Sequence, residues 1–367
     1  MKFTCDKNNL IEGINIVQRA VPTKTTTPIL EGILLEVGEE LTLTGNDNEF
    51  GIVYEVPAII EAIGSIVLPS KTFGDIVRKL PDIYVSIETN EEDSTVSISS
   101  GSAHYKIKTF PAESYPPVVP IEVNNPVEIS ESVLQNMIKQ TAFAASQDDK
   151  RMILRGVYIE YRDKTMNFVA VDGFRLAMKT LEREEAMDFG VIVPTKVLNE
   201  MMKVLQPNEE NVRFCCNENQ IMFFTDHFKM VSRLYKGDFV DYRKMLPREF
   251  KVTVVIDTKQ FLAGIERAAL VMQDEKKYHL VLKLLDSDEV KLSANAENGI
   301  SNETISAEVS GGELELGFNP KNLMDCLRVI NDEKISVSFT SDIGPCLIRG
   351  EEDESFTFLV MPVRTRG

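Results

Sequence analysis

Residues 67–81 read Val-Leu-Pro-Ser-Lys-Thr-Phe-Gly-Asp-Ile-Val-Arg-Lys-Leu-Pro, and the pattern of this stretch occurs three times in the chain. Lys71, Lys196 and Lys321 lie 125 residues apart, and each is followed by an acid four residues later and a base seven residues later. Apolar residues recur two, five, six and nine residues after each lysine. At about 100° per residue, the charged and apolar positions fall on opposite faces of a helix. The sequence therefore predicts one amphipathic helix written three times.

The repeat also predicts three domains. A period of 125 residues is far longer than the roughly 20–50 residues of solenoids and propellers, so each repeat should be a whole domain. We predict domain boundaries that give 1–125, 126–252 and 253–367. Each unit reads as a strand, a helix, several strands, a second helix and further strands, which places the chain in the α+β class.

The first helix of each unit follows a residue that is typical of a helix N-cap. Asp6, Ser130 and Asp257 each come directly after a short alternating strand and before an apolar stripe with helical spacing. We therefore predict six helices, over residues 7–20, 70–80, 130–145, 194–205, 258–272 and 320–330.

The charge of the chain is unevenly distributed. Its formal net charge is −17, which by itself argues against an open-faced DNA-binding protein. The six predicted helices, however, carry a formal charge of +6, so the rest of the chain carries −23. A protein of this kind could present its helices to a polyanion and repel it elsewhere.

The charged stripe also has an ordinary explanation. A lysine with an acid four residues later is a common solvated pair worth about 0.2–0.5 kcal/mol. Threefold recurrence makes a shared function more credible, although common ancestry of the repeats could also preserve the pattern. Both interpretations remain open at this point.

Sequence motifs for catalysis are absent. The chain has no phosphate-binding loop, no zinc-protease motif, no serine-hydrolase elbow and no dinucleotide fingerprint. Five cysteines form no CxxC pair, and three histidines are scattered, so neither a metal site, a disulfide framework nor a cofactor is expected. Without a secretion signal or an apolar run of about 18 residues, we expect a soluble, cytoplasmic protein that is not an enzyme.

Two stretches resemble a known family. Ala-Val-Asp-Gly-Phe-Arg-Leu-Ala at 170–177 and Leu-Val-Met-Pro-Val-Arg at 359–364 are similar to signature segments of the bacterial DNA polymerase III beta subunit, the sliding clamp family. Residues 1–3, 27–30, 239–243 and 317–319 agree with the same family. The resemblance covers the whole chain in order, and together with the three repeats it is specific.

The resemblance implies an architecture and a function. Members of this family have three clamp domains per chain, each with two helices packed on antiparallel sheets. Two chains pair head to tail into a six-domain ring, which is possible because a heterologous contact can close on itself. The ring surrounds duplex DNA without regard to sequence and tethers the replicative polymerase, and another protein must open and load it. The partners implied are the DNA polymerase III alpha subunit, the clamp loader and other polymerases and repair proteins.

A ring of this kind needs only weak phosphate contacts, because linkage keeps it on DNA. By position, the resemblance assigns Lys24, which replaces an arginine found in some members, and Arg151 to the DNA-facing surface. The charged positions of the three repeated helices predict the other DNA-facing residues. The predicted DNA-facing residues are Lys24, Lys71, Arg78, Arg151, Lys196, Lys203, Lys321 and Arg328. The acids between them, Asp75, Glu200 and Asp325, would keep this contact weak.

The resemblance also implies an apolar cleft between the second and third domains that binds short linear peptides of partners. The matching residues are Leu154, Val171, Gly173, Phe174, Arg175, Leu176, Val240, Ile343, Val360, Met361, Pro362, Val363 and Arg364. Apolar residues of distant segments usually form core, but a methionine and a proline near the C-terminus favour an adaptable groove. Val171, Phe174 and Val240 depart from the residues frequent in the family, so the preferred peptide could differ. The role of the tail at 365–367 stays open.

The main hypothesis is therefore a dimeric processivity clamp. The alternative is a three-domain protein-interaction scaffold that never encircles DNA. A dimer mass and a visible ring would distinguish the first from the second.

Overall fold

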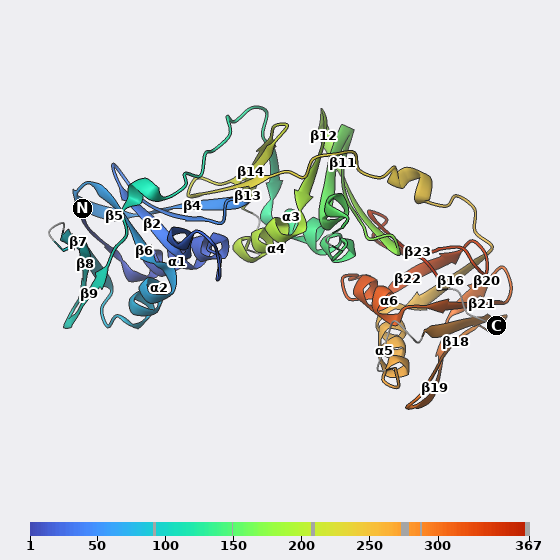
Figure 1. Cartoon of the computed structure of the whole chain (residues 1–367). Coiled ribbons are helices and arrows are strands. Elements are labelled where there is room, and N and C mark those ends of the chain that lie inside the picture. Colours follow the sequence, from blue (N-terminus) through green and yellow to red (C-terminus); the bar gives the residue numbers. More distant parts are fainter. Residues whose placement is uncertain (91–92, 149, 207–209, 273–278, 287, 364–367) are drawn as a thin grey trace. The chain divides into compact units, whose positions relative to one another are not determined.

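The computed structural model describes residues 1–90, 93–148, 150–206, 210–272, 279–286 and 288–363 (Figure 1). The chain divides into two compact units, Met1–Ser132 with Lys203–Leu234, and Val133–Met202 with Tyr235–Gly367. Neither unit coincides with one sequence repeat, because the second repeat contributes strands to both. Among the described residues, no helix is long and apolar enough to cross a membrane.

The described residues form six α-helices, at the six places that the sequence predicts. They are α1 (Lys7–Val17), α2 (Ser70–Lys79), α3 (Glu131–Lys139), α4 (Thr195–Val204), α5 (Thr258–Ala269) and α6 (Pro320–Leu327). The largest error is in α3, which ends six residues before the predicted end at 145. The Thr141 hydroxyl donates a 2.7 Å hydrogen bond back to the Met137 carbonyl, and such local bonds compete with continuation of the helix.

Two of the predicted N-caps are confirmed. The Asp6 carboxylate accepts from the N–H groups of Asn8 and Asn9, and the Asp257 carboxylate accepts from that of Gln260. These bonds satisfy N–H groups that have no partner within the helix. Ser130 ends strand β10 (Val127–Ser130), and its role as a cap stays a prediction.

The amphipathic character of the repeated helices is confirmed. In α2, Phe73 and Val77 are buried whereas Lys71 and Arg78 are exposed. Leu198 of α4 and both Leu323 and Leu327 of α6 are also buried at the corresponding positions, Met202 of α4 is half-buried, and the lysines at 196, 203 and 321 are exposed. The periodicity of 3.6 residues per turn therefore assigned the inward and outward faces correctly.

The first unit contains two antiparallel sheets. The five-stranded sheet has the order β5 (Ala58–Ala62), β1 (Lys2–Asp6), β7 (Tyr84–Asn90), β8 (Thr95–Ser100) and β9 (Ala103–Lys108). The eight-stranded sheet has the order β10, β13 (Asn211–Cys216), β14 (Gln220–Phe224), β15 (Phe228–Arg233), β4 (Phe50–Val56), β3 (Leu41–Asn46), β2 (Gly32–Val37) and β6 (Gly64–Pro69). Pairing of β15 with β4 joins the second repeat to the first within one sheet.

The second unit repeats this arrangement. Its seven-stranded sheet has the order β11 (Gly156–Val171), β12 (Arg175–Pro194), β24 (Phe356–Val360), β23 (Cys346–Gly350), β22 (Lys334–Phe339), β16 (Val252–Asp257) and β20 (Glu308–Ser310). Its four-stranded sheet has the order β19 (Gly299–Ser306), β18 (Glu289–Ala296), β17 (Leu280–Leu285) and β21 (Leu314–Phe318). Here β12 pairs with β24, so the third repeat joins the second as the second joins the first.

Helices pack in pairs against these sheets. Contacts join α1 to α2 in the first unit and α5 to α6 in the second, and Figure 1 shows each pair side by side. Gly45 of β3 shows how close the packing is, because a Cβ at this position would lie 2.1 Å from the carbonyl oxygen of Val17 at the end of α1. Only glycine allows the helix end to approach the strand this closely.

Candidate functional site

Arg78 of α2 and Arg328 at the C-terminal end of α6 are exposed but paired. In the first repeat, Arg78 bonds Asp75 at 3.1 Å and the Asn15 side chain of α1 at 3.0 Å. In the third repeat, Arg328 bonds Glu266 of α5 at 2.9 Å. Each arginine therefore links its helix to the neighbouring one, and both side chains remain partly exposed to solvent.

The other predicted DNA-facing residues are also exposed. Lys71, Lys196, Lys203 and Lys321 lie on the outward faces of α2, α4 and α6. Lys24 precedes the 3₁₀ turn at Pro28–Glu31, and Arg151 precedes the corresponding turn at Met152–Arg155. Exposed positive charge thus occurs in all three sequence repeats.

A tight loop connects β11 to β12. The Asp172 carboxylate accepts hydrogen bonds from the N–H groups of Phe174 at 2.8 Å and Arg175 at 3.0 Å. Gly173 has a φ of 95°, a backbone conformation that favours glycine. As a result, the loop presents Phe174 at its tip with 65% of its surface exposed.

The Arg175 side chain fixes this loop to α6 and to the segment that contains Phe143. Its buried guanidinium bonds Asp172 at 3.0 Å, Asp325 of α6 at 2.7 Å and the Phe143 carbonyl at 2.8 Å. Burial alone would lower the pKa of Arg175, but the bond to Asp325 and the nearby carboxylate charges outweigh it and raise that pKa above its ordinary value. Because Asp172 and Asp325 both bond Arg175, the loop is fixed to the third repeat.

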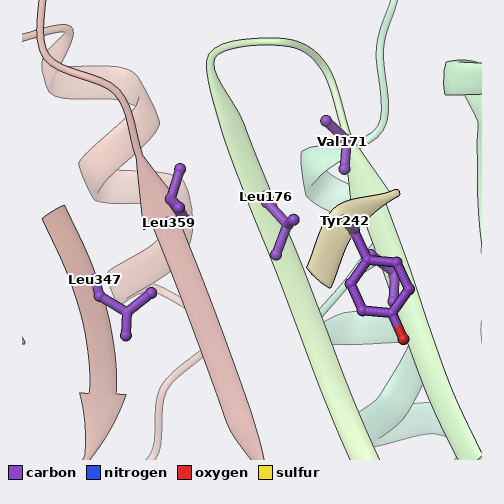
Figure 2. Close-up of a cluster of buried hydrophobic side chains, with 6 residues drawn as sticks. Val171, Leu176, Tyr242, Leu347 and Leu359 are labelled. Atoms are coloured by element: carbon purple, nitrogen blue, oxygen red, sulfur yellow. The ribbon is translucent and has the colours of Figure 1, made fainter. Parts of the chain in front are cut away.

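An apolar cluster lies beneath the loop and is drawn in Figure 2. Its buried members are Val169, Val171, Leu176, Tyr242, Leu347 and Leu359. They come from β11 and β12, from the segment that links the second and third repeats, and from β23 and β24. Leu154, Tyr158, Met178 and Phe239 pack against this cluster from its margin.

A buried carboxylate holds the linking segment in place. Glu160 of β11 accepts a 2.8 Å hydrogen bond from the Tyr242 hydroxyl and forms an ion pair with Arg243. Burial would raise the pKa of Glu160, but the hydrogen bonds from Arg243 and Tyr242 outweigh it and lower that pKa. Burial, together with the same hydrogen bond, raises the pKa of Tyr242.

The C-terminal segment completes this region. The Met361 N–H donates to the Phe174 carbonyl at 2.8 Å, and the Val363 N–H donates to the Gly317 carbonyl at 2.9 Å. These bonds place the segment after β24 beside the loop between β11 and β12. Met361 is exposed, whereas Val360 is buried.

Comparison with known proteins decides the family. Models of the N-terminal, central and C-terminal domains of the DNA polymerase III beta subunit match residues 1–120, 128–241 and 243–364. The chain belongs to the DNA polymerase III beta subunit family. The beta sliding clamps of Bacillus subtilis and Staphylococcus aureus are 34% and 32% identical to it, each over 100% of both chains.

Solved structures agree with this assignment. The sliding clamp of Bacillus subtilis has a TM-score of 0.96 at 34% identity, with 100% of both chains covered. A putative beta subunit from Eubacterium rectale has a TM-score of 0.95 at 33% identity, again over 100% of both chains. The predicted fold class of three tandem clamp domains with mixed helices and sheets is therefore confirmed.

For this member of the beta subunit family, the structure brings together the predicted cleft residues of the loop between β11 and β12 and those of the C-terminal segment, because Met361 bonds Phe174 and Arg175 pairs with Val360. Gly173, Phe174, Val240, Ile343 and Met361 are exposed, and Leu154, Pro362 and Val363 are partly buried. Val171, Arg175, Leu176 and Val360 are buried. Arg364 lies outside the described residues, as does the tail at 365–367.

Several residues of this region were missed from the sequence. Tyr242, Leu347 and Leu359 form the centre of the cluster, yet only their place in alternating or family-like segments could have marked them. Asp325 was assigned to the DNA-facing stripe of α6, but its carboxylate bonds the loop arginine Arg175. Among the described residues, no group of three or more His, Cys, Asp or Glu side chains is arranged to hold a metal ion.

Proposed function

We propose that this sliding clamp works as one half of a head-to-tail dimeric ring, which encircles duplex DNA and tethers the replicative polymerase to it. The observation that carries the proposal is the exposed basic helix face, which recurs in all three repeats of a chain with a net charge of −17. The domain boundaries near 125 and 252 belong to the same proposal.

The charge arrangement suits a ring that slides. Arg78 and Arg328 are already held by neighbouring carboxylates, so a phosphate must compete with those carboxylates for each guanidinium. Contacts of this kind are individually weak, depend on salt and carry no sequence information. The acidic remainder of the chain would repel the polyanion from other surfaces. Retention on DNA would then come from topology.

Two sheet edges suit a contact between copies of the chain. Within the described residues, β9 pairs only with β8 and β19 pairs only with β18, so each presents one row of backbone groups that lacks a strand partner. Exposed apolar side chains lie there, Tyr105 on β9 and Ile300 on β19. Because the two edges differ, pairing β9 of one copy with β19 of another would be head to tail, and such contacts can close into a ring.

The loop between β11 and β12 and the segment after β24 form the proposed partner cleft. Phe174, Val240, Ile343 and Met361 are apolar and exposed, which is typical of a surface that another protein covers. Met361 can adapt to side chains of different shape. Short linear peptides of the polymerase alpha subunit, the clamp loader and repair proteins are the proposed ligands.

The proposed role is that of an accessory subunit without catalysis. A protein with this role works in the cytoplasm, where bacterial DNA lies, and this role requires no cofactor. The polymerase supplies the chemistry, and the clamp supplies its attachment to the template.

The experiment has two steps. Native mass measurement should give about twice the chain mass of 41.3 kDa, as expected for two copies. After enzymatic loading onto closed circular DNA, the protein should stay bound until the circle is cut, and then leave within seconds to minutes. Equal lifetimes on circular and linearised DNA, or a monomer at micromolar concentration, would contradict the proposal.

A further inference from the structure

Asp325 lies between two guanidinium groups that serve different surfaces. Its Oδ2 accepts the 2.7 Å hydrogen bond from Arg175, which anchors the loop of the proposed cleft. Its Oδ1 lies 3.9 Å from Nη1 of Arg328, on the proposed DNA-facing side of α6. Arg328 also forms an ion pair with Glu266 of α5, with 2.9 Å between the nitrogen and the oxygen. One carboxylate therefore connects the loop beside the cleft with the basic face of the helix.

The sequence repeats provide an internal comparison. Asp75 occupies the same position in α2, where it bonds Arg78 of its own helix and its side chain is 54% exposed. The Asp325 side chain is only 20% exposed and reaches a residue 150 positions away in sequence. The same position in the repeat thus forms a solvated pair in one domain and a link between domains in another.

We propose that Asp325 is a positioning residue that couples the partner-peptide cleft to the basic face of α6. The inference rests on the proposed function of these two surfaces. Arg175 and Arg328 share one carboxylate, Arg175 through Oδ2 and Arg328 through Oδ1, and each positive charge draws electron density from the other's oxygen. When a DNA phosphate draws Arg328 away, Asp325 is left to Arg175, and the loop that carries Phe174 is held more firmly in its binding shape. DNA contact at Arg328 therefore strengthens peptide binding, and by reciprocity peptide binding strengthens that contact.

The size of the coupling follows from the weaker of the two pairs. Arg328 is 52% exposed and its nearest nitrogen is 3.9 Å from the less exposed Asp325, so this ion pair is long, screened on the arginine side and weak. Such pairs change an equilibrium by about 1.4- to fivefold. Removing Arg328 should therefore tighten peptide binding about two- to fivefold. Removing the carboxylate that orients buried Arg175 should weaken peptide binding by about tenfold or more.

The test measures the Kd of a synthetic peptide from the C-terminal end of the organism's own polymerase alpha subunit, by fluorescence polarisation with the full chain. Arg328→Ala should tighten binding about two- to fivefold, and Asp325→Asn should weaken it about tenfold. The double variant should match Asp325→Asn, because the arginine acts only through the carboxylate. A short DNA duplex at low salt should tighten binding to the wild type and leave Asp325→Asn unchanged.

Matched controls separate this coupling from general charge effects. Lys334 of the same repeat is also 52% exposed and also bonds a carboxylate, that of Glu308 at 3.1 Å. Lys334→Ala and Asp75→Asn should leave the Kd unchanged. If Arg328→Ala gives the wild-type Kd, or Lys334→Ala tightens binding equally, the inference is wrong. This comparison decides the matter even if Asp325→Asn fails to fold.

A second variant distinguishes an error in the proposed cleft from an error in the proposed coupling. The double substitution Met361→Ala with Pro362→Ala alters the cleft and does not touch Asp325. If the peptide binds that variant as well as the wild type, the cleft itself is misplaced. If that variant binds the peptide more weakly while Arg328→Ala has no effect, the proposed cleft is supported and the proposed coupling through Asp325 is refuted.

Discussion

Replacing Glu160 by glutamine should loosen the segment that links the second and third repeats. Glu160 has a side-chain exposure of 4% and holds both Tyr242 and Arg243. Glutamine keeps the shape but loses the charge, and its amide N–H₂ would face a guanidinium that has no acceptor to offer. Hydrogen bonds to charged groups contribute about 1.5–3 kcal/mol each. Because Arg243 is half exposed and water can rehydrate it, the lower part of that range applies, about 2 kcal/mol.

Native-state hydrogen exchange can measure this loss locally, which matters because a chain of several domains need not unfold in one step. The Lys244 N–H bonds the Asp241 carbonyl at 3.2 Å within the segment, so its exchange reports on opening there. A loss of about 2 kcal/mol corresponds to about 30-fold faster exchange under rapid-closing conditions. Tyr242→Phe, which keeps the ion pair, should give a smaller increase of about fivefold, equivalent to about 1 kcal/mol.

The control uses a carboxylate that also bonds an arginine but lies at the surface. Asp226 bonds Arg213 at 2.6 Å and its side chain is 85% exposed, so Asp226→Asn should not change exchange anywhere in the linking segment. If Glu160→Gln accelerates exchange less than twofold, the buried carboxylate does not hold this segment, and the account of the region beneath the cleft is wrong.

Further predictions concern pH, DNA, peptide and packing. Because Glu160 has a pKa below its ordinary value of 4.5, its stabilisation is complete above that pH and disappears as the pH falls through the lowered pKa. The protection of amides in the linking segment, relative to their intrinsic exchange rate at each pH, should therefore fall on acidification more steeply in the wild type than in Glu160→Gln. Asp75→Ala releases Arg78 and should raise affinity for a short duplex at low salt about two- to fivefold, measured by polarisation; an unchanged affinity would remove Arg78 from the DNA-facing set. Phe174→Ala removes an exposed aromatic ring and should weaken a polymerase-tail peptide about tenfold without changing the melting temperature; equal affinity would place the peptide elsewhere. Gly45→Ala places a Cβ 2.1 Å from the Val17 carbonyl and should destabilise the first unit by about 1–3 kcal/mol in urea, whereas Gly38→Ala, which meets nothing within 4 Å, should have little effect.

The helices were predictable because their signal is local. Positions such as Phe73 and Val77 repeat every three to four residues, and burial follows from that spacing alone. Asp6 and Asp257 could be recognised as caps for the same reason, since a cap bonds N–H groups two or three residues away. Near the end of α3, the Thr141 hydroxyl bonds back to the Met137 carbonyl, and the sequence does not say whether a threonine makes such a bond.

The contacts of the candidate site are not local, and the sequence alone did not reveal them. Asp325 looks like Asp75 in its helix, and only the fold brings it to Arg175, 150 residues away in sequence. Tyr242 and Glu160 likewise meet across 82 positions. The family resemblance named the loop and the C-terminal segment, but the division of their residues into an exposed rim and a buried support required coordinates.

Strand pairing across the repeats affects how the chain can be cut. A fragment that ends near 125 would leave β4 without β15, and one that ends near 252 would leave β12 without β24. Each cut would turn a central strand that carries apolar side chains into a new edge strand. Exposed apolar edge strands are prone to aggregation. The three repeats are therefore separate in sequence but not separable as soluble fragments, and attempts to express one repeat alone should add a strand or a charged substitution to protect the exposed edge.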